Sequence, residues 1–149
     1  MYSEQVIDVG CGWGAGGIWC AKKLGSKVTS MDADENVFRF LEITANINKV
    51  STTHLTMKFE KLRKKDLQKY DLLIAADICF WDELVNPVYN MVNRAIKAGV
   101  KQVLITDPER PTFLDMAERC LKKFGGELLE IETRGSIDAK GSILVINNF

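Results

Sequence analysis

The chain has 149 residues, of which 27% are charged and 46% hydrophobic, and its 20 basic and 20 acidic side chains cancel. This length predicts one domain, residues 1–149, with a core of its own. The lack of net charge argues against nucleic-acid and membrane partners, and no run approaches the ~20 apolar residues of a membrane span.

The cysteines do not form a metal-binding pattern. Cys11, Cys20, Cys79 and Cys120 contain no C-x-x-C pair, and His54 is the only histidine. We therefore expect no metal site, and we interpret the four cysteines as reduced thiols of a cytoplasmic protein.

The first predicted elements are a strand at 5–9, a glycine loop and a helix at 16–24 that Gly25 ends. Glycines at 10, 12 and 14 follow Asp8 to give Asp-x-Gly-x-Gly-x-Gly. Glycine lets a ligand approach the backbone, and the helix start offers free N–H groups. Dinucleotide loops have the spacing G-x-G-x-x-G. Here Asp8 would repel a pyrophosphate but can bind a ligand that carries an ammonium group; the alternative is a glycine turn without a ligand.

The second predicted strand, 27–31, ends at Asp32, and a helix at 35–47 or 48 follows. Asp32 stands 24 residues after Asp8, where an acid can accept hydrogen bonds from both hydroxyls of a ribose. Met31 and Ala33 beside it are apolar and suit an adenine edge. NAD would use the same acid, so Asp32 predicts a nucleoside cofactor without choosing which one.

The region 49–69 gives the weakest pattern. A third strand is expected at 54–59, with a charged turn after it, and Glu60 is the nearest candidate to hold an adenine. The basic residues of this turn are interrupted by Glu60 and Asp66, which favours a solvated surface over a nucleic-acid patch. They are Lys58, Lys61, Arg63, Lys64, Lys65 and Lys69.

A continuous apolar run at 70–76 predicts a fully buried strand. Asp77 follows it, at the carboxyl end of a central strand and beside the glycine loop in the expected sheet. Phe80 and Trp81 come next. These aromatics either wall a ligand channel or pack in the core. Asp82 and Glu83 are interpreted as the first turn of a helix at 83–97.

The remaining elements are a strand at 100–106, a helix at 112–124 stopped by Gly125-Gly126, and strands at 127–133 and 142–148 joined by a hairpin connection at 135–141. Strands and helices alternate through most of the chain, which predicts a parallel sheet covered on both faces. The last two strands would close an antiparallel edge.

The glycine loop with Asp8, together with Asp32, resembles motif I of the class I methyltransferases, which bind S-adenosylmethionine. The resemblance implies an α/β, Rossmann-like, doubly wound sheet of seven strands in the order 3-2-1-4-5-7-6. It also implies that the loop passes beside the methionine and that Asp8 helps to place its amino group. In this family helices before the first strand form part of a lid. Only four residues precede the strand here, so we expect a short form or a fragment that lacks these helices.

Two later segments resemble the protein lysine methyltransferase branch that includes the electron-transfer-flavoprotein β-subunit enzyme. Asp77-x-x-Phe80 matches an Asp/Glu-x-x-Tyr/Phe signature, and the segment 105–110 is similar to a Gly-Asp-Pro-x-Arg pattern with Thr106 in place of its glycine. A carboxylate near the methyl sulfonium would capture and orient the ammonium form of an amine acceptor, and Asp77 is the candidate for this role. No Asn-Pro-Pro-Tyr motif follows the fourth strand, which argues against amide or base nitrogens as acceptors.

These observations predict an S-adenosylmethionine-dependent N-methyltransferase that acts on a protein lysine. The expected catalytic residues are Asp77, Phe80 and Trp81. The expected cofactor-binding residues are Asp8, Gly10, Cys11, Gly12, Gly14, Asp32, Ala33, Glu60 and Asp77. Three alternatives stay open: a small-molecule amine methyltransferase, a cofactor-binding module without activity, and a nicotinamide-dependent oxidoreductase, which the glycine spacing and Asp8 disfavour.

Overall fold

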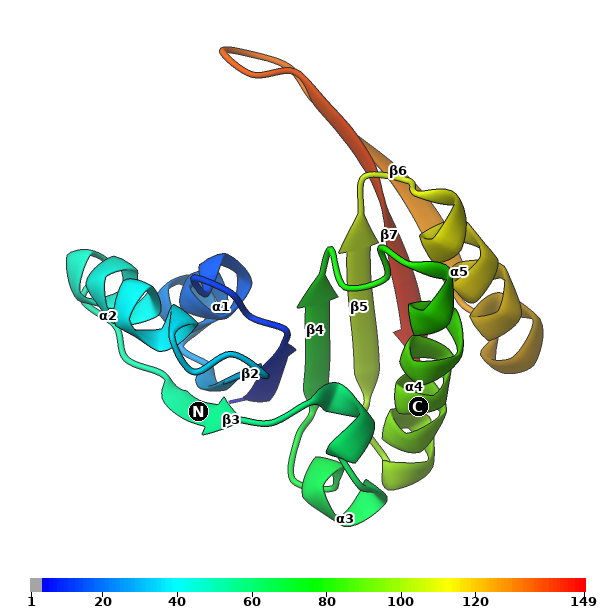
Figure 1. The fold of residues 1–149 in the computed structure, drawn as a ribbon, viewed down its shortest axis with the longest axis horizontal. Coiled ribbons are helices and arrows are strands. Elements are labelled where there is room, and N and C mark those ends of the chain that lie inside the picture. The colour runs from blue at the N-terminus through cyan, green and yellow to red at the C-terminus, as the bar shows by residue number, and fades with distance from the viewer. Residues whose placement is uncertain (1–3) are drawn as a thin grey trace.

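A seven-stranded sheet forms the centre of the computed structural model, which describes residues 4–149 (Figure 1). The strands lie in the order β3-β2-β1-β4-β5-β7-β6, so the predicted order is confirmed. The first five strands of that order are parallel, and β7 runs antiparallel to both β5 and β6. The strands are β1 Gln5–Val9, β2 Lys27–Asp32, β3 Thr53–Thr56, β4 Leu72–Ala76, β5 Gln102–Asp107, β6 Glu127–Thr133 and β7 Ala139–Asn147.

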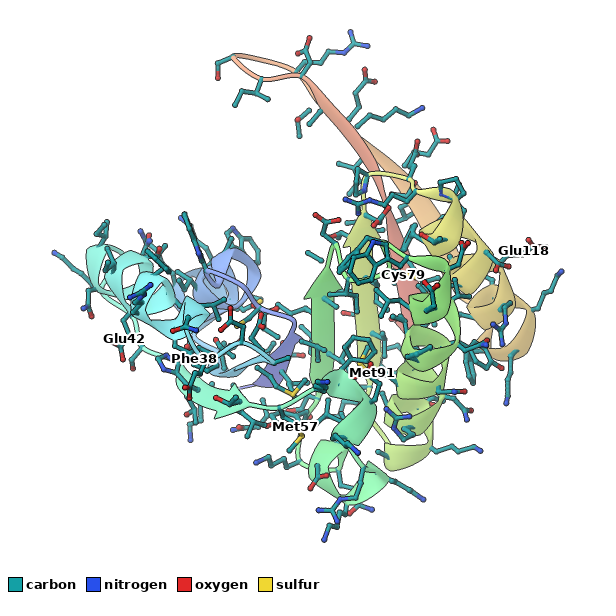
Figure 2. All side chains as sticks on the ribbon, viewed as in Figure 1. Phe38, Glu42, Met57, Cys79, Met91 and Glu118 are labelled. Atoms are coloured by element: carbon teal, nitrogen blue, oxygen red, sulfur yellow. The ribbon has the colours of Figure 1, made fainter. Side chains whose placement is uncertain are left out.

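Helices cover the two faces of the sheet because alternate side chains of each strand point in opposite directions. Ile7 and Val9 of β1 belong to the larger core, which Met91 of α4 and Phe113 of α5 complete (Figure 2). Val6 points the other way and packs with α1. The α-helices are α1 Ala15–Leu24, α2 Val37–Ile47, α3 Lys64–Leu67, α4 Val85–Ala98 and α5 Pro111–Phe124, and the 3₁₀ turns are Phe59–Lys61 and Asp82–Leu84.

The boundaries predicted between residues 49 and 85 are partly wrong. The expected strand at 54–59 is shorter, since β3 ends at Thr56 and Phe59 already begins a 3₁₀ turn. The charged turn after it folds into the short helix α3, where the Asp66 carboxylate accepts the backbone N–H of Arg63 at 2.9 Å and caps the helix start. Asp82 and Glu83 form a separate 3₁₀ turn before α4.

Strands four, five and seven also begin away from their predicted positions. Strand β4 starts at Leu72 rather than at 70, and β5 covers 102–107 rather than 100–106. Strand β7 begins at Ala139 rather than at 142, because Ala139 pairs with Thr133 and lengthens the hairpin. The other predicted elements agree with the structure to within two residues.

The β6–β7 hairpin extends beyond the body of the domain (Figure 1). Every residue of β6 is exposed, whereas alternate residues of β7 are buried against the sheet. The hairpin therefore forms one edge of the molecule.

Two further findings concern membrane spans and metal sites. The longest helices between residues 4 and 149, α4 and α5, have 14 residues each and a mixed polar surface, and no helix in this range has the length or apolar character of a membrane span. The four cysteines are free thiols, and the described residues contain no cluster of ligand side chains that could hold a metal ion.

Candidate active site

The glycine loop turns sharply between β1 and α1. Gly10, Gly12 and Gly14 all have positive φ angles, of 65°, 52° and 85°. A Cβ on Gly10 would lie 2.8 Å from Ile78, and one on Gly14 would lie 2.7 Å from Leu41, whereas one on Gly12 would meet no protein atom within 4 Å. The loop therefore needs glycine at 10 and 14 for packing, and Gly12 faces open space.

Asp32, at the end of β2, is tied to this loop. Its Oδ2 atom accepts the backbone N–H of Gly12 at 3.0 Å, and its Oδ1 atom accepts that of Asp34 at 3.0 Å. Each carboxylate oxygen can accept more than one hydrogen bond. Asp32 can therefore hold the loop and still bind hydroxyl groups of a ligand.

Asp8, in β1, is nearly buried on the α1 side of the sheet. It is 5% exposed, and its Oδ2 atom accepts the backbone N–H of Gly17 at 3.0 Å. Burial raises the pKa of Asp8 from its ordinary value to about 6; the Gly17 hydrogen bond opposes this shift and the nearby Asp32 adds to it. An ammonium group would stabilise the ionised form of such a carboxyl.

A pocket of about 460 Å³ opens at the carboxyl ends of β1, β2 and β4. This is where ligands bind in open α/β sheets, and the volume lies in the usual range for cofactor sites. Most of the predicted site residues line it: Gly10, Asp32, Ala33, Glu60, Asp77, Phe80 and Trp81. The structure thus brings together residues from four separate segments of the chain.

The remaining predicted residues do not line this pocket. Asp8, Gly10 and Cys11 line a second cavity of about 430 Å³ between α1 and the sheet. Gly12 and Gly14 line neither cavity, although Gly12 is hydrogen-bonded to Asp32. Burial, with Asp8 and Asp32 nearby, raises the pKa of the Cys11 thiol to about 12, so this thiol stays protonated and is a poor nucleophile.

With Glu60, Asp77 is one of two exposed acids that line the pocket. Its side chain is 59% exposed, and its backbone has a φ of 61°, a left-handed conformation that is uncommon outside glycine. Phe80 and Trp81, 44% and 65% exposed, lie edge to face with ring centres 4.9 Å apart. The two aromatic rings therefore do not belong to the core, whereas Cys79 between them and Asp77 is fully buried.

Sequence reasoning missed the main partner of Asp77. The guanidinium of Arg110 donates hydrogen bonds to Asp77 and to Asp107. The similarity of the segment 105–110 to Gly-Asp-Pro-x-Arg assigns no role to this arginine. Sequence reasoning also missed two apolar walls of the pocket, which come from Met57 and Phe59.

Comparison with known proteins decides the family. A family profile described as a methyltransferase domain matches residues 6–99, which include the glycine loop, Asp32 and Asp77. The chain belongs to the methyltransferase-domain family. S-adenosylmethionine is the cofactor of this domain. The carboxylates of Asp8 and Asp32 suit the ammonium group and the ribose hydroxyls of that molecule, so the residues present fit it.

Individual relatives agree with this family assignment. The chain is 27% identical over 109 residues to the electron transfer flavoprotein β-subunit lysine methyltransferase of Xenopus laevis, and 22% identical over 110 residues to that of Homo sapiens. These matches cover 73% and 74% of the chain, but only 44% and 41% of the relatives, so the matched region spans less than half of their length. Among solved structures, the N-terminal domain of human METTL16 in complex with SAH has a TM-score of 0.72 at 13% identity, and the match covers 99% of this chain and 62% of that one.

Proposed function

We propose that this domain transfers a methyl group from S-adenosylmethionine to the side-chain amine of a protein lysine. The observation that carries the proposal is the place of Asp77. Its exposed carboxylate lines the same 460 Å³ pocket as Gly10 and Asp32. An amine that reaches Asp77 therefore enters the pocket of the cofactor. The names of the two curated relatives support lysine as the acceptor.

A lysine acceptor arrives in the wrong protonation state. With a pKa near 10.4, about one lysine in 2,500 is neutral at pH 7, a deficit of about 4.6 kcal/mol. Asp77 would attract the ammonium and orient its nitrogen, and one proton would leave to water before transfer, because only the neutral nitrogen has the lone pair that attacks the methyl group. Bound S-adenosylmethionine supplies the electrophilic methyl group and leaves as S-adenosylhomocysteine.

The exposed rings of Phe80 and Trp81 suit the walls of an amine channel. An alkylammonium over an aromatic face gains about 0.5–1 kcal/mol at an exposed site and more when water is excluded. Both rings line the pocket that contains Asp77. Catalysis would then rest largely on the placement of the amine nitrogen against the methyl group.

The test is methyl transfer from radiolabelled S-adenosylmethionine to a cell lysate, followed by mass spectrometry of the labelled fraction. We expect label in one or a few protein bands, with methyl groups on lysine. Asp77→Asn is the matched variant, because it keeps the shape of the side chain and should remove most of the label. Label in the small-molecule fraction would support a small-amine methyltransferase, and label that disappears with ribonuclease would point to RNA. Tight binding of S-adenosylmethionine without label in any fraction would overturn the proposal in favour of a binding module.

A further inference from the structure

Arg110 connects the ends of two neighbouring strands. Strands β4 and β5 are adjacent, with Ala76 opposite Thr106, so Asp77 and Asp107 lie side by side at the same edge of the sheet. The guanidinium Nη1 of Arg110 donates to Oδ1 of Asp77 and, at 2.9 Å, to Oδ1 of Asp107. The backbone N–H of Arg110 also donates to Oδ2 of Asp107, at 2.7 Å.

The two acids differ in their exposure to solvent. The side chain of Asp107 is 1% exposed, whereas that of Asp77 is 59% exposed. Asp107 therefore anchors Arg110 from inside the domain, and Arg110 reaches from this anchor to the acid that lines the cofactor pocket. The side chains of Asp107, Arg110 and Asp77 therefore form a hydrogen-bonded series from the buried end of β5 to the pocket.

The backbone around these three side chains is held in place. Asp77 and Glu109 are two of the three non-glycine residues with positive φ among the described residues, at 61° and 73°. The N–H of Asp77 donates to the carbonyl of Thr106 at 2.9 Å. The carboxylate of Glu109 accepts the hydroxyl of Ser142, a buried residue of β7, at 2.8 Å. Unusual backbone conformations persist only where their surroundings hold them, and they cluster at functional sites.

The charges of the cluster formed by Asp77, Asp107 and Arg110 do not balance. One guanidinium faces two carboxylates, and the neighbouring pair of Glu109 and Lys140, 3.9 Å apart, adds no net charge. Arg110 occupies Oδ1 of Asp77, and no described residue donates a hydrogen bond to Oδ2. The cluster can therefore take one more cation, and Asp77 is the member that can reach it.

We propose that Arg110 is a positioning residue, which holds Asp77 so that its second carboxylate oxygen faces the incoming amine. The inference deepens the proposed function and rests on it. It also narrows the acceptor to an amine that is cationic when it binds, because a neutral acceptor would leave the extra negative charge unpaired. Arg110 itself does not touch the reacting atoms.

A double-mutant cycle tests this dependence. The assay measures single-turnover methyl transfer to the lysate proteins that the parent labels. Because Arg110 acts through one partner, we expect Arg110→Ala to slow transfer about 10- to 100-fold in the parent but less than about 3-fold in the Asp77→Asn background. Arg110→Lys should recover part of the loss, since it restores the charge without the planar fork. Calorimetry should find cofactor affinity changed by less than about 3-fold, since Arg110 does not line the cofactor pocket.

Controls separate positioning from simple destabilisation. Arg119→Ala removes a cation from α5, the helix that begins directly after Arg110. Arg119 donates a hydrogen bond to Asn86 instead, so this variant should leave transfer unchanged. Arg110→Gln keeps a donor for the buried Asp107 and replaces Arg110→Ala if that variant fails to fold. The ¹⁵N resonance of the Arg110 guanidinium should differ between the parent and Asp77→Asn. This comparison detects the ion pair without an activity assay.

The outcomes distinguish the two proposals. If the parent labels no protein, the proposed function fails and the inference falls with it. If the parent is active but Arg110→Ala has no effect, or slows transfer equally in both backgrounds, the positioning role is overturned while the function stands. An unshifted Arg110 resonance in Asp77→Asn would also overturn it.

Discussion

The backbone N–H of Gly12 donates a hydrogen bond of 3.0 Å to the carboxylate of Asp32. This bond joins the glycine loop to the end of the neighbouring strand across 20 residues of sequence. Asp32 therefore has two tasks in the proposed site. It holds the loop in its turn, and it offers its free lone pairs to the ribose of the cofactor.

Asp32→Ala should weaken S-adenosylmethionine binding by at least ~1.5 kcal/mol, because the ribose hydroxyls lose a charged acceptor. Titration calorimetry measures the difference. Asp34→Ala is the matched control, since its carboxylate only accepts hydrogen bonds from Asn36 at the surface. An Asp32→Ala variant with parental affinity would remove Asp32 from the site.

Gly12→Val should abolish cofactor binding and leave a folded domain. The new side chain meets no protein atom and fills space beside the pocket, while the φ of 52° costs about 1–2 kcal/mol of stability. Gly14→Val should instead destabilise the domain itself, because its Cβ would collide with Leu41. Circular dichroism and calorimetry on both variants separate the two effects; a Gly12→Val domain that still binds would show that the loop does not approach the ligand.

The raised pKa of Asp8 predicts how stability depends on pH. Since the folded domain favours the neutral carboxyl up to pH about 6, the free energy of unfolding should fall as pH rises from about 4 to above 6. The full loss corresponds to about 3 kcal/mol, from a shift of about two pKa units. Asp8→Asn keeps an oxygen for the Gly17 N–H and should remove most of this decline. Urea unfolding at pH 5 and pH 7.5 tests it, and equal pH dependence in both proteins would contradict the assignment.

The same titration should appear in cofactor binding. An ammonium group prefers the ionised carboxylate, so the affinity for S-adenosylmethionine should rise with pH and level off above about 6. Binding below that pH should release protons, which calorimetry detects as a dependence of the heat on the buffer. Asp8→Asn should bind more weakly and with a flat profile. A flat profile in the parent would mean that Asp8 does not face the amino group.

Asp77→Asn should keep most of the cofactor affinity and lose methyl transfer. The amide preserves the size of the side chain but not the charge that attracts an ammonium. A loss of about 10²- to 10³-fold is expected, by analogy with the removal of one transition-state interaction. Single-turnover rates at saturating cofactor separate chemistry from binding. Transfer at the parental rate would make Asp77 structural.

The sequence predicted the parts of the site that depend on local patterns. The glycine loop, Asp32 and Asp77 each end a strand whose apolar run can be read directly, and the structure places all three at one edge of the sheet. Glu60 lines the pocket as expected, but from a 3₁₀ turn rather than from a strand end. The short apolar run before it contained too few residues to mark where pairing with β2 stops.

Other features depended on contacts between distant segments. Arg110 meets Asp77 because β4 and β5 are neighbours, and no spacing within the chain shows which oxygen a guanidinium selects. The exposure of Phe80 and Trp81 also follows from tertiary packing, since aromatic residues after a buried strand fit a core equally well. The early start of β7 follows from its pairing with β6 rather than from its own residues.

The position of β7 has a consequence for how the domain folds. Although β7 follows β6 in the chain, it lies between β5 and β6, and Gln102 pairs with Asn147 across 45 residues. Strand β6 cannot join the sheet until β7 has docked on β5. Pairing over such separations is slow, and the backbone N–H and C=O groups along one side of β5 stay unpaired during synthesis until residues 139–147 have left the ribosome. The side of the sheet formed by β5, β7 and β6, where Asp107 ends β5, should therefore be the last part to become native.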